Sequence, residues 1–144
     1  MTGLDNNIFG LTFHHMGLAV KKSDTALIYA KGLGYEASDE IYDPEQDAHL
    51  ILCTQSGWPS IEVVTPGKQE DGPLAPIFKR YNELIYHTCY ETQDLNKTLQ
   101  AWEEHNLRIL PVSEPKPAIL FGGRKVSFYT ILGLGLVELL ETDE

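Results

Sequence analysis

The chain of 144 residues contains only two cysteines, Cys53 and Cys89. They are too few and too far apart for a disulfide framework or a zinc knuckle. No apolar run approaches the roughly 20 residues that a bilayer-spanning helix needs. The opening residues, MTGLDNNIFG, lack the basic start and apolar centre of a signal peptide. These absences predict a cytoplasmic protein with no membrane partner.

Basic residues are also scarce, with 11 Lys and Arg against 21 Asp and Glu and a formal net charge of −10. This balance excludes nucleic acid and anionic membranes as partners, because both are bound by clustered Lys and Arg. A local basic patch can still hold a small anionic ligand. Hydrophobic residues make up 42% and charged residues 22%, which is ordinary for one domain with a buried core. We therefore expect a single domain over residues 1–144.

The order of predicted elements occurs twice along the chain. In the first half (about 12–66), alternation of apolar residues predicts strands at 13–20, 35–42, 48–54 and 60–65. A helix is predicted between a Ser23–Asp24 cap and Gly34. In the second half (about 84–141), strands are predicted at 84–91, 107–112, near 118–120, at 125–131 and at 134–141. Its helix is predicted at 95–105, capped by Thr92 or Asp94.

A linker joins the halves, TPGKQEDGPLAPIFKRYNE at 65–83, with three Pro and two Gly and one or two helical turns expected within 75–81. The first half therefore reads strand–helix–strand–strand–strand, and the second half repeats this order with one more short stretch, near 118–120. This order predicts an α+β fold with a mainly antiparallel sheet, since a parallel sheet needs regular alternation of strands and helices.

Four polar residues occupy matching places in the two halves. His15 and His87 head the first strand of each half, and Glu62 and Glu138 lie in the last strands. Both glutamates have apolar neighbours, in SIEVVTP and GLVELLE, where a buried carboxylate is costly unless it is compensated. A divalent cation would compensate both carboxylates, and two imidazoles with two carboxylates suit zinc, nickel, cobalt, manganese or iron(II).

Each of these four residues, taken singly, could instead be a polar strand residue with no part in a site. A glutamate in a half-exposed strand usually faces solvent, and a strand histidine is usually a satisfied polar residue. The repeated placement favours a shared site. His14 would lie on the opposite face from His15 in a regular strand, so we interpret it as structural.

At these residues the chain resembles the vicinal oxygen chelate superfamily, also called the glyoxalase/bleomycin-resistance/dioxygenase group, and within it the methylmalonyl-CoA epimerases. The resemblance runs through HHMGLAV, PEQ, IEVVTP, YHTCYET, GGRKVSFY and GLGLVELLE. It implies paired βαβββ modules that form a curved, half-open mixed sheet around a metal-binding cavity, and a homodimer. It also implies that one divalent metal ion is bound by His15, Glu62, His87 and Glu138.

The resemblance further implies an isomerase or lyase that transfers a proton through a metal-stabilised enolate, on a small molecule such as an acyl-CoA thioester. Glu138 would be one catalytic base. The epimerases have a second carboxylate a few residues after PEQ, where this chain has Leu50. The neighbouring His49 would reach the same face only if the strand register shifted by one residue, so His49 is either a second catalytic residue or an outer-face histidine.

The segment FGGRKVSF is the second informative stretch. Gly122 and Gly123 allow a tight turn or a close approach to a ligand, and Arg124 and Lys125 follow directly. In an acidic protein this basic pair predicts a substrate-binding site for a phosphate or carboxylate. The alternative is a plain hairpin with solvated basic residues.

Two other classes of protein in this superfamily are alternatives to an isomerase or lyase. A non-haem iron extradiol dioxygenase uses two histidines and one glutamate, so Glu62 would be a surplus fourth ligand. A drug-binding protein of the bleomycin-resistance type lacks metal ligands, whereas this chain has all four.

Overall fold

The computed structural model describes residues 6–142, which form one curved sheet with helices at its two ends. In chain order the elements are β1 (Leu11–Val20), α1 (Asp24–Gly32), β2 (Glu36–Ala37), β3 (Ile41–Asp43), β4 (Ala48–Gln55), β5 (Trp58–Pro66), α2 (Ala75–Phe78), β6 (Glu83–Thr92), α3 (Leu95–Glu104), β7 (Ile109–Pro117), the 3₁₀ helix η2 (Ile119–Phe121), β8 (Lys125–Ile131) and β9 (Gly135–Glu141).

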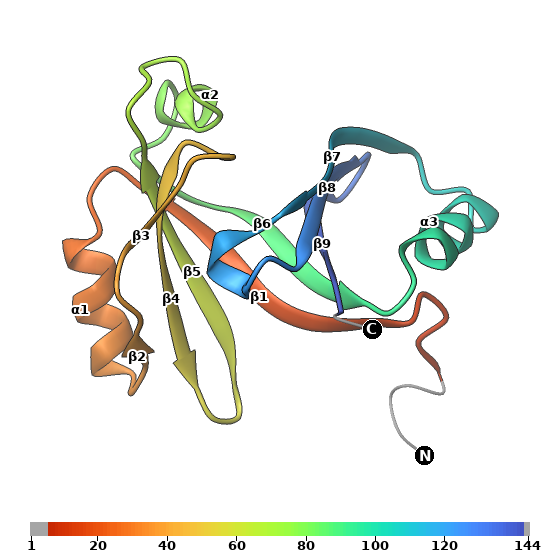
Figure 1. The fold of residues 1–144 in the computed structure, drawn as a ribbon, viewed down its shortest axis with the longest axis horizontal. Coiled ribbons are helices and arrows are strands. Elements are labelled where there is room, and N and C mark those ends of the chain that lie inside the picture. The colour runs from red at the N-terminus through yellow and green to blue at the C-terminus, as the bar shows by residue number, and fades with distance from the viewer. Residues whose placement is uncertain (1–5, 143–144) are drawn as a thin grey trace.

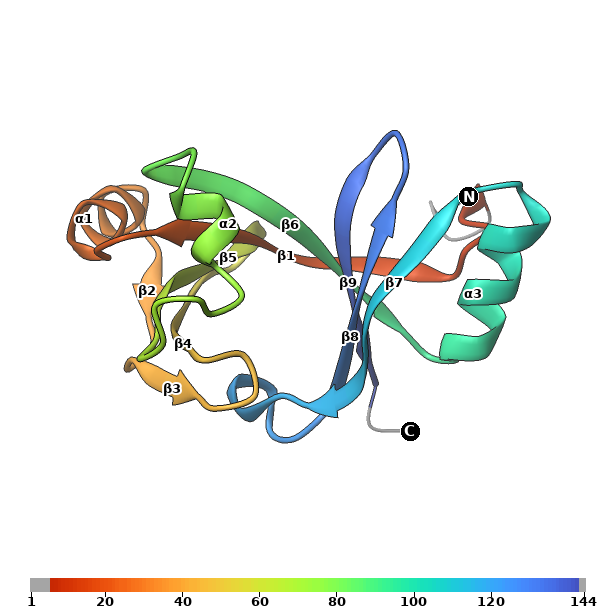
Figure 2. The same ribbon diagram turned by 90° about the horizontal axis from the view of Figure 1, so that it is seen from above.

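The sheet has nine strands in the order β2-β4-β5-β1-β6-β9-β8-β7, with β3 paired to β4. β1 and β6 run antiparallel through its centre, while β1 pairs parallel with β5 and β6 pairs parallel with β9. One module therefore lies on each side of the central pair, as Figures 1 and 2 show. The sheet is mixed and open, and the predicted pair of βαβββ modules is confirmed.

Each module buries its helix against the outer face of its own strands. α1 places Ala30 against Val20, Ile51 and Val63, while α3 places Trp102 among residues of β8 and β9 such as Tyr129. The cap of α3 is Asp94, one of the two predicted residues, because its side chain accepts a hydrogen bond from the backbone N–H of Lys97. The helices cover the outer faces, so the other face of each module turns toward its counterpart.

Two predicted strands are wrong. The stretch 35–42 is interrupted, because the Ser38 hydroxyl accepts from Leu52 N–H and the Ser38 N–H donates to the Leu52 carbonyl. Those bonds bend the chain between β2 and β3. The stretch near 118–120 is the 3₁₀ helix η2, because the Ala118 carbonyl accepts from Phe121 and Gly123.

Within residues 6–142, no helix is long and apolar enough to cross a membrane. The cytoplasmic location stays a prediction.

Candidate metal centre

The four repeated residues lie on four adjacent strands, β5, β1, β6 and β9. The register aligns Glu62, Gly17 and His87 in one row across the sheet, and Glu138, Cys89 and His15 in the next. Each row therefore joins the glutamate of one module to the histidine of the other module, across a small residue of the strand between them. Because the two modules contribute to both rows, residues far apart in the sequence converge.

The side chains of His15, Glu62, His87 and Glu138 meet at a single point and are 0–3% exposed. The two histidine Nε2 atoms are 3.3 Å apart. Glu138 Oε1 lies 3.1 Å from His15 Nε2 and 3.0 Å from His87 Nε2, and Glu62 Oε1 lies 3.5 Å from each. The four atoms form one compact cluster.

These separations fit ligands of a single ion. With bonds of about 2.1 Å, adjacent ligand atoms around one divalent ion lie about 3.0–3.4 Å apart. Hydrogen bonding alone leaves the cluster incomplete, because His87 Nδ1 is buried and has no hydrogen-bond partner among the described residues. Nitrogen and oxygen donors without thiolate suit zinc, nickel, cobalt, manganese or iron and do not distinguish among them.

Contacts within the cluster shift the pKa values of His15 and Glu138 toward their charged forms. Burial lowers the pKa of His15, but hydrogen bonds to Glu138 and Glu62 outweigh burial and raise it to about 9. Burial likewise raises the pKa of Glu138, but hydrogen bonds from His15 and His87 lower it to about 2. Glu138 is therefore an ionised carboxylate at neutral pH, the form that can bind a cation.

Aromatic rings hold the two imidazoles in position. Phe121 of η2 stacks on His15, with ring centroids 5.5 Å apart. Tyr86 and Phe128 pack edge-on against His87 at 4.5 and 5.4 Å. Burial raises the pKa of the Tyr86 hydroxyl well above its usual value, so this group stays neutral.

A cavity of about 700 Å³ lies beside the cluster and between the modules. Tyr86 and Phe128 line it, so the rings that support His87 also form part of its wall. Leu136 lines it too, two residues before Glu138 on the same face of β9. Its polar lining includes Asp43 and Lys116, whose ammonium group lies 3.8 Å from Glu45.

His49 lies elsewhere. Leu50 is buried on the inner face of β4 with Ala48, while His49 is on the opposite face and its Nδ1 is 3.5 Å from Glu40. The catalytic role of His49 stays a prediction, and it is without geometric support because His49 neither joins the cluster nor lines the cavity.

The GGRK segment forms a turn between η2 and β8. Gly122 and Gly123 have positive φ of 67° and 86°, which accounts for glycine at both positions. The Arg124 guanidinium donates to the carboxylate of Glu91 and to the carbonyl of Glu141. None of the four residues of this segment lines the cavity, so their role in substrate binding stays a prediction.

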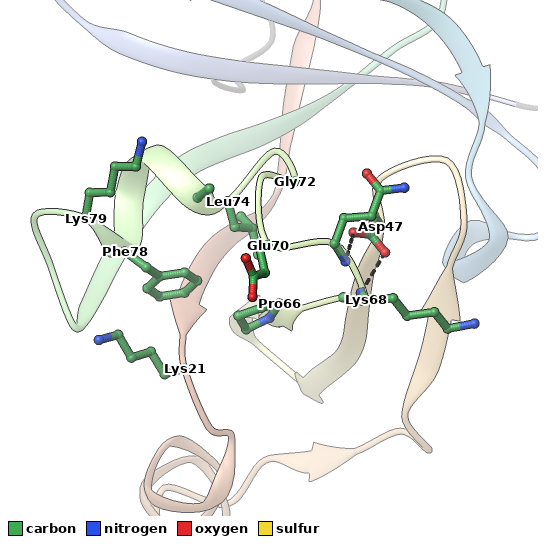
Figure 3. A pocket seen from close by; sticks show the side chains of 12 residues that line it. Lys21, Asp47, Pro66, Lys68, Glu70, Gly72, Leu74, Phe78 and Lys79 are labelled. Carbon is green, nitrogen blue, oxygen red and sulfur yellow. Dashed lines mark hydrogen bonds between the residues drawn. The ribbon is translucent and has the colours of Figure 1, made fainter.

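A second, more open pocket of about 440 Å³ lies beside the linker. Figure 3 shows Lys21 and Lys79 on either side of the Phe78 ring, while Lys68 extends away. Asp47 holds the adjacent loop by accepting from the backbone N–H groups of Lys68 and Gln69. Leu74 lines both this pocket and the cavity beside the cluster, so the two are neighbours.

The sequence interpretation missed three residues of the site, which are Gly17, Tyr86 and Lys116. A glycine within a strand pattern signals a close approach to that position, and this signal was present at Gly17. Tyr86 is adjacent to His87 in sequence, but a regular strand would point the two side chains to opposite faces. Lys116 had no local signal, because it reaches the cavity only through the hairpin of β7 and β8.

Comparison with known proteins identifies the family. A sequence profile of the Glyoxalase/Bleomycin resistance protein/Dioxygenase superfamily matches residues 14–128. The chain belongs to this superfamily. A search of curated proteins gave no match.

Among solved structures, methylmalonyl-CoA epimerase from Mycobacterium tuberculosis is similar with a TM-score of 0.74 at 20% identity, covering 92% of this chain and 88% of the other. A hypothetical protein from Bacillus halodurans has a TM-score of 0.76 at 23% identity, covering 93% and 96%. A variant of Streptomyces coelicolor methylmalonyl-CoA epimerase, in complex with 2-nitronate-propionyl-CoA, has a TM-score of 0.71 at 20% identity, covering 93% and 99%. At these identities the likeness shows the fold.

Proposed function

We propose that this protein is a metal-dependent enzyme of the isomerase or lyase type that moves a proton at an acidic C–H of a small carbonyl compound. The observation that carries the proposal is the convergence of His15, Glu62, His87 and Glu138 at one buried point. These four residues would hold one divalent ion. When bound, such an ion acts as a Lewis acid that stabilises negative charge on substrate oxygens.

Glu138 is the proposed base. Its carboxylate is ionised, because the imidazoles of His15 and His87 keep its pKa low. In the proposed step the Glu138 carboxylate takes the proton from the substrate carbon. The electron pair of the broken C–H bond forms a carbon–carbon double bond, and the negative charge moves onto the carbonyl oxygen. Return of the proton to the same carbon or to a neighbouring atom completes the reaction.

The residues on the inner face of β4 support a one-base reaction. Leu50 and Ala48 present apolar side chains on the inner face of β4, and neither can transfer a proton. Inversion at carbon requires proton delivery to the face opposite the one that Glu138 attacks. We therefore favour isomerisation, or an elimination with one base, over epimerisation by two carboxylates.

The proposed substrate is an acyl thioester or a related 2-substituted carbonyl compound. The cavity volume of about 700 Å³ and its mixed lining, with Lys116 beside Val126 and Leu136, suit an acyl group with an anionic substituent. Similar structures are described as complexes with methylmalonyl-CoA and with 2-nitronate-propionyl-CoA, which supports a thioester as the first compound to test.

The alternative of an extradiol dioxygenase is less well supported. Its two histidines and one glutamate leave positions free for substrate and oxygen. Glu62 makes the same 3.5 Å approach to both imidazoles here, so it would occupy one of those positions. We also propose that the protein forms a homodimer, as the family resemblance implies, and that it is cytoplasmic, as the sequence predicts.

The test is exchange of an acidic C–H for deuterium, followed by NMR, with 2-substituted acyl thioesters and 2-hydroxy-carbonyl compounds and with each of the five candidate metals. Exchange that requires metal and the Glu138 carboxylate would support the proposal. Metal-loaded protein that exchanges no proton across the whole panel would overturn it. Exchange with retention of configuration would identify a one-base enzyme, whereas an inverted product would require a second base and contradict the assignment from Leu50.

A further inference from the structure

His14 lies at an irregularity in β1. The β1–β6 ladder pairs Phe13 with Tyr90 and His15 with Cys89, which leaves His14 unpaired between two adjacent partners of β6. Such a bulge re-aims side chains, so that His14 no longer points away from its neighbour. The expectation that His14 lies on the face opposite His15 is therefore wrong, because it assumed a regular strand.

The bulge brings the two imidazoles together. His14 Nδ1 is 2.8 Å from His15 Nδ1, and the ring centroids are 5.1 Å apart at 79°. A hydrogen bond at this separation needs one proton between the two nitrogens, so one ring donates and the other accepts.

The rest of the cluster decides which ring donates. His15 directs its Nε2 toward Glu62 and Glu138, where a bound ion would take the lone pair of that atom. An imidazole that gives the Nε2 lone pair to a metal carries its remaining proton on Nδ1. The Nδ1–H of His15 must then donate to His14 Nδ1. His14 consequently carries its own proton on Nε2, which its half-buried position allows to reach water.

We propose that His14 is a positioning residue of the metal centre: its Nδ1 accepts the Nδ1–H of His15 and thereby fixes the tautomer and the direction of the metal-binding Nε2. The inference rests on the proposed metal centre. Partners of this kind make the metal-binding histidine more basic and hold its ring in place.

Two further contacts support this role. Phe121 packs edge-on against His14 at 5.2 Å and stacks on His15 at 5.5 Å, so a single ring fixes both imidazoles. The other histidine of the cluster has no such partner, because His87 Nδ1 is buried without a hydrogen bond among the described residues. Among the described residues, a hydrogen-bond partner at Nδ1 is therefore found for His15 and not for His87.

The experiment compares two variants, one without and one with a hydrogen-bond acceptor in the side chain of residue 14. His14→Phe keeps a ring against Phe121 but removes the acceptor. His14→Asn places its amide oxygen where Nδ1 of the imidazole lies and restores an acceptor. Zinc and cobalt dissociation constants are measured by chelator competition on protein stripped of metal, and circular dichroism of the metal-free forms checks that each variant folds.

We expect His14→Phe to weaken metal binding about tenfold to a hundredfold, and His14→Asn to recover most of that affinity. In ¹⁵N spectra of labelled histidine, the His15 Nδ1–H tautomer should persist in the parent and in His14→Asn, and give way to a mixture in His14→Phe. Equal metal affinity in the parent and His14→Phe would overturn the inference, as would an equal loss in both variants. A parent that binds metal but exchanges no substrate proton would defeat the proposed reaction and leave the role of His14 intact.

Discussion

Gly17 and His87 face each other across β1 and β6, and the imidazole occupies the space that a side chain at residue 17 would fill. A Cβ at Gly17 would overlap His87 Cε1 and lie 2.7 Å from His87 Nε2, well inside van der Waals contact. The backbone of Gly17 does not have positive φ, so glycine is needed there for space alone. The missing side chain of one strand therefore makes room for the His87 imidazole of the next.

Gly17→Ala should displace the His87 ring and weaken metal binding by more than about tenfold, approaching the loss in His87→Ala. The measurement is the zinc dissociation constant by chelator competition. Gly32→Ala is the matched control, because a methyl group at Gly32 of α1 would meet no neighbouring atom within 4 Å, and this variant should bind metal normally. Unchanged metal affinity in Gly17→Ala would contradict the contact between residue 17 and His87.

The chain order of the elements, the duplication and the four converging residues could be predicted because they depend on local patterns that occur twice. The alternation around His15 and His87 marks strands, and the apolar neighbours of Glu62 and Glu138 mark buried strands. A repeat then predicts that equivalent residues meet about a shared axis.

The remaining features depend on contacts between distant segments or on small irregularities. The bulge at His14 has no local signature, so the sequence could not reveal the contact between the two adjacent histidines. Arg124 was predicted to be free for substrate, but it binds Glu91 of β6, a partner 33 positions away. Lys116 enters the cavity because β7 continues to Pro117, five residues beyond the predicted end of that strand at 112.

Because of Asp47, we expect the free energy of unfolding to depend on pH in the acidic range. The hydrogen bond from Tyr42 and those from the N–H groups of Lys68 and Gln69 lower the pKa of its carboxyl. A carboxyl with a depressed folded-state pKa stabilises the protein above its unfolded-state pKa of about 3.9, and that stability is lost as pH falls through the lower folded-state value. The Tm of Asp47→Asn should therefore lie below that of the parent at pH 7, and the gap should narrow toward pH 3.

Thermal unfolding followed by circular dichroism at several pH values tests this dependence. Asp71→Asn serves as the control, because it removes the same charge at an exposed position of the linker that Asp47 contacts. A gap for Asp47→Asn that widens on acidification would show that the hydrogen bonds at Asp47 do not favour the ionised form.

Substitution of Lys116 and of Lys125 tests where an anionic part of the substrate binds. Lys116 lines the cavity, whereas Lys125 is exposed and precedes Val126, which lines it. Lys116→Ala should raise KM severalfold with little change in kcat, because a contact made equally in the ground state and the transition state affects binding alone. Lys125→Ala should leave both constants near those of the parent. The reverse pattern, measured with the same thioester, would restore the GGRK turn as the anion site.

Glu138→Gln separates the role of Glu138 in catalysis from its role in binding metal. The amide keeps the size of the side chain and one oxygen that can face the cation, but it cannot accept a proton at neutral pH. We expect kcat for deuterium exchange to fall by at least about 100-fold, within the range that general bases contribute, while metal occupancy falls far less. Glu62→Gln is the control, because Glu62 makes the longer 3.5 Å approaches to the imidazoles and has no proposed role in proton transfer. Metal content by elemental analysis and exchange rate by NMR are measured on the same samples. If Glu62→Gln loses exchange while Glu138→Gln retains it, the base is Glu62.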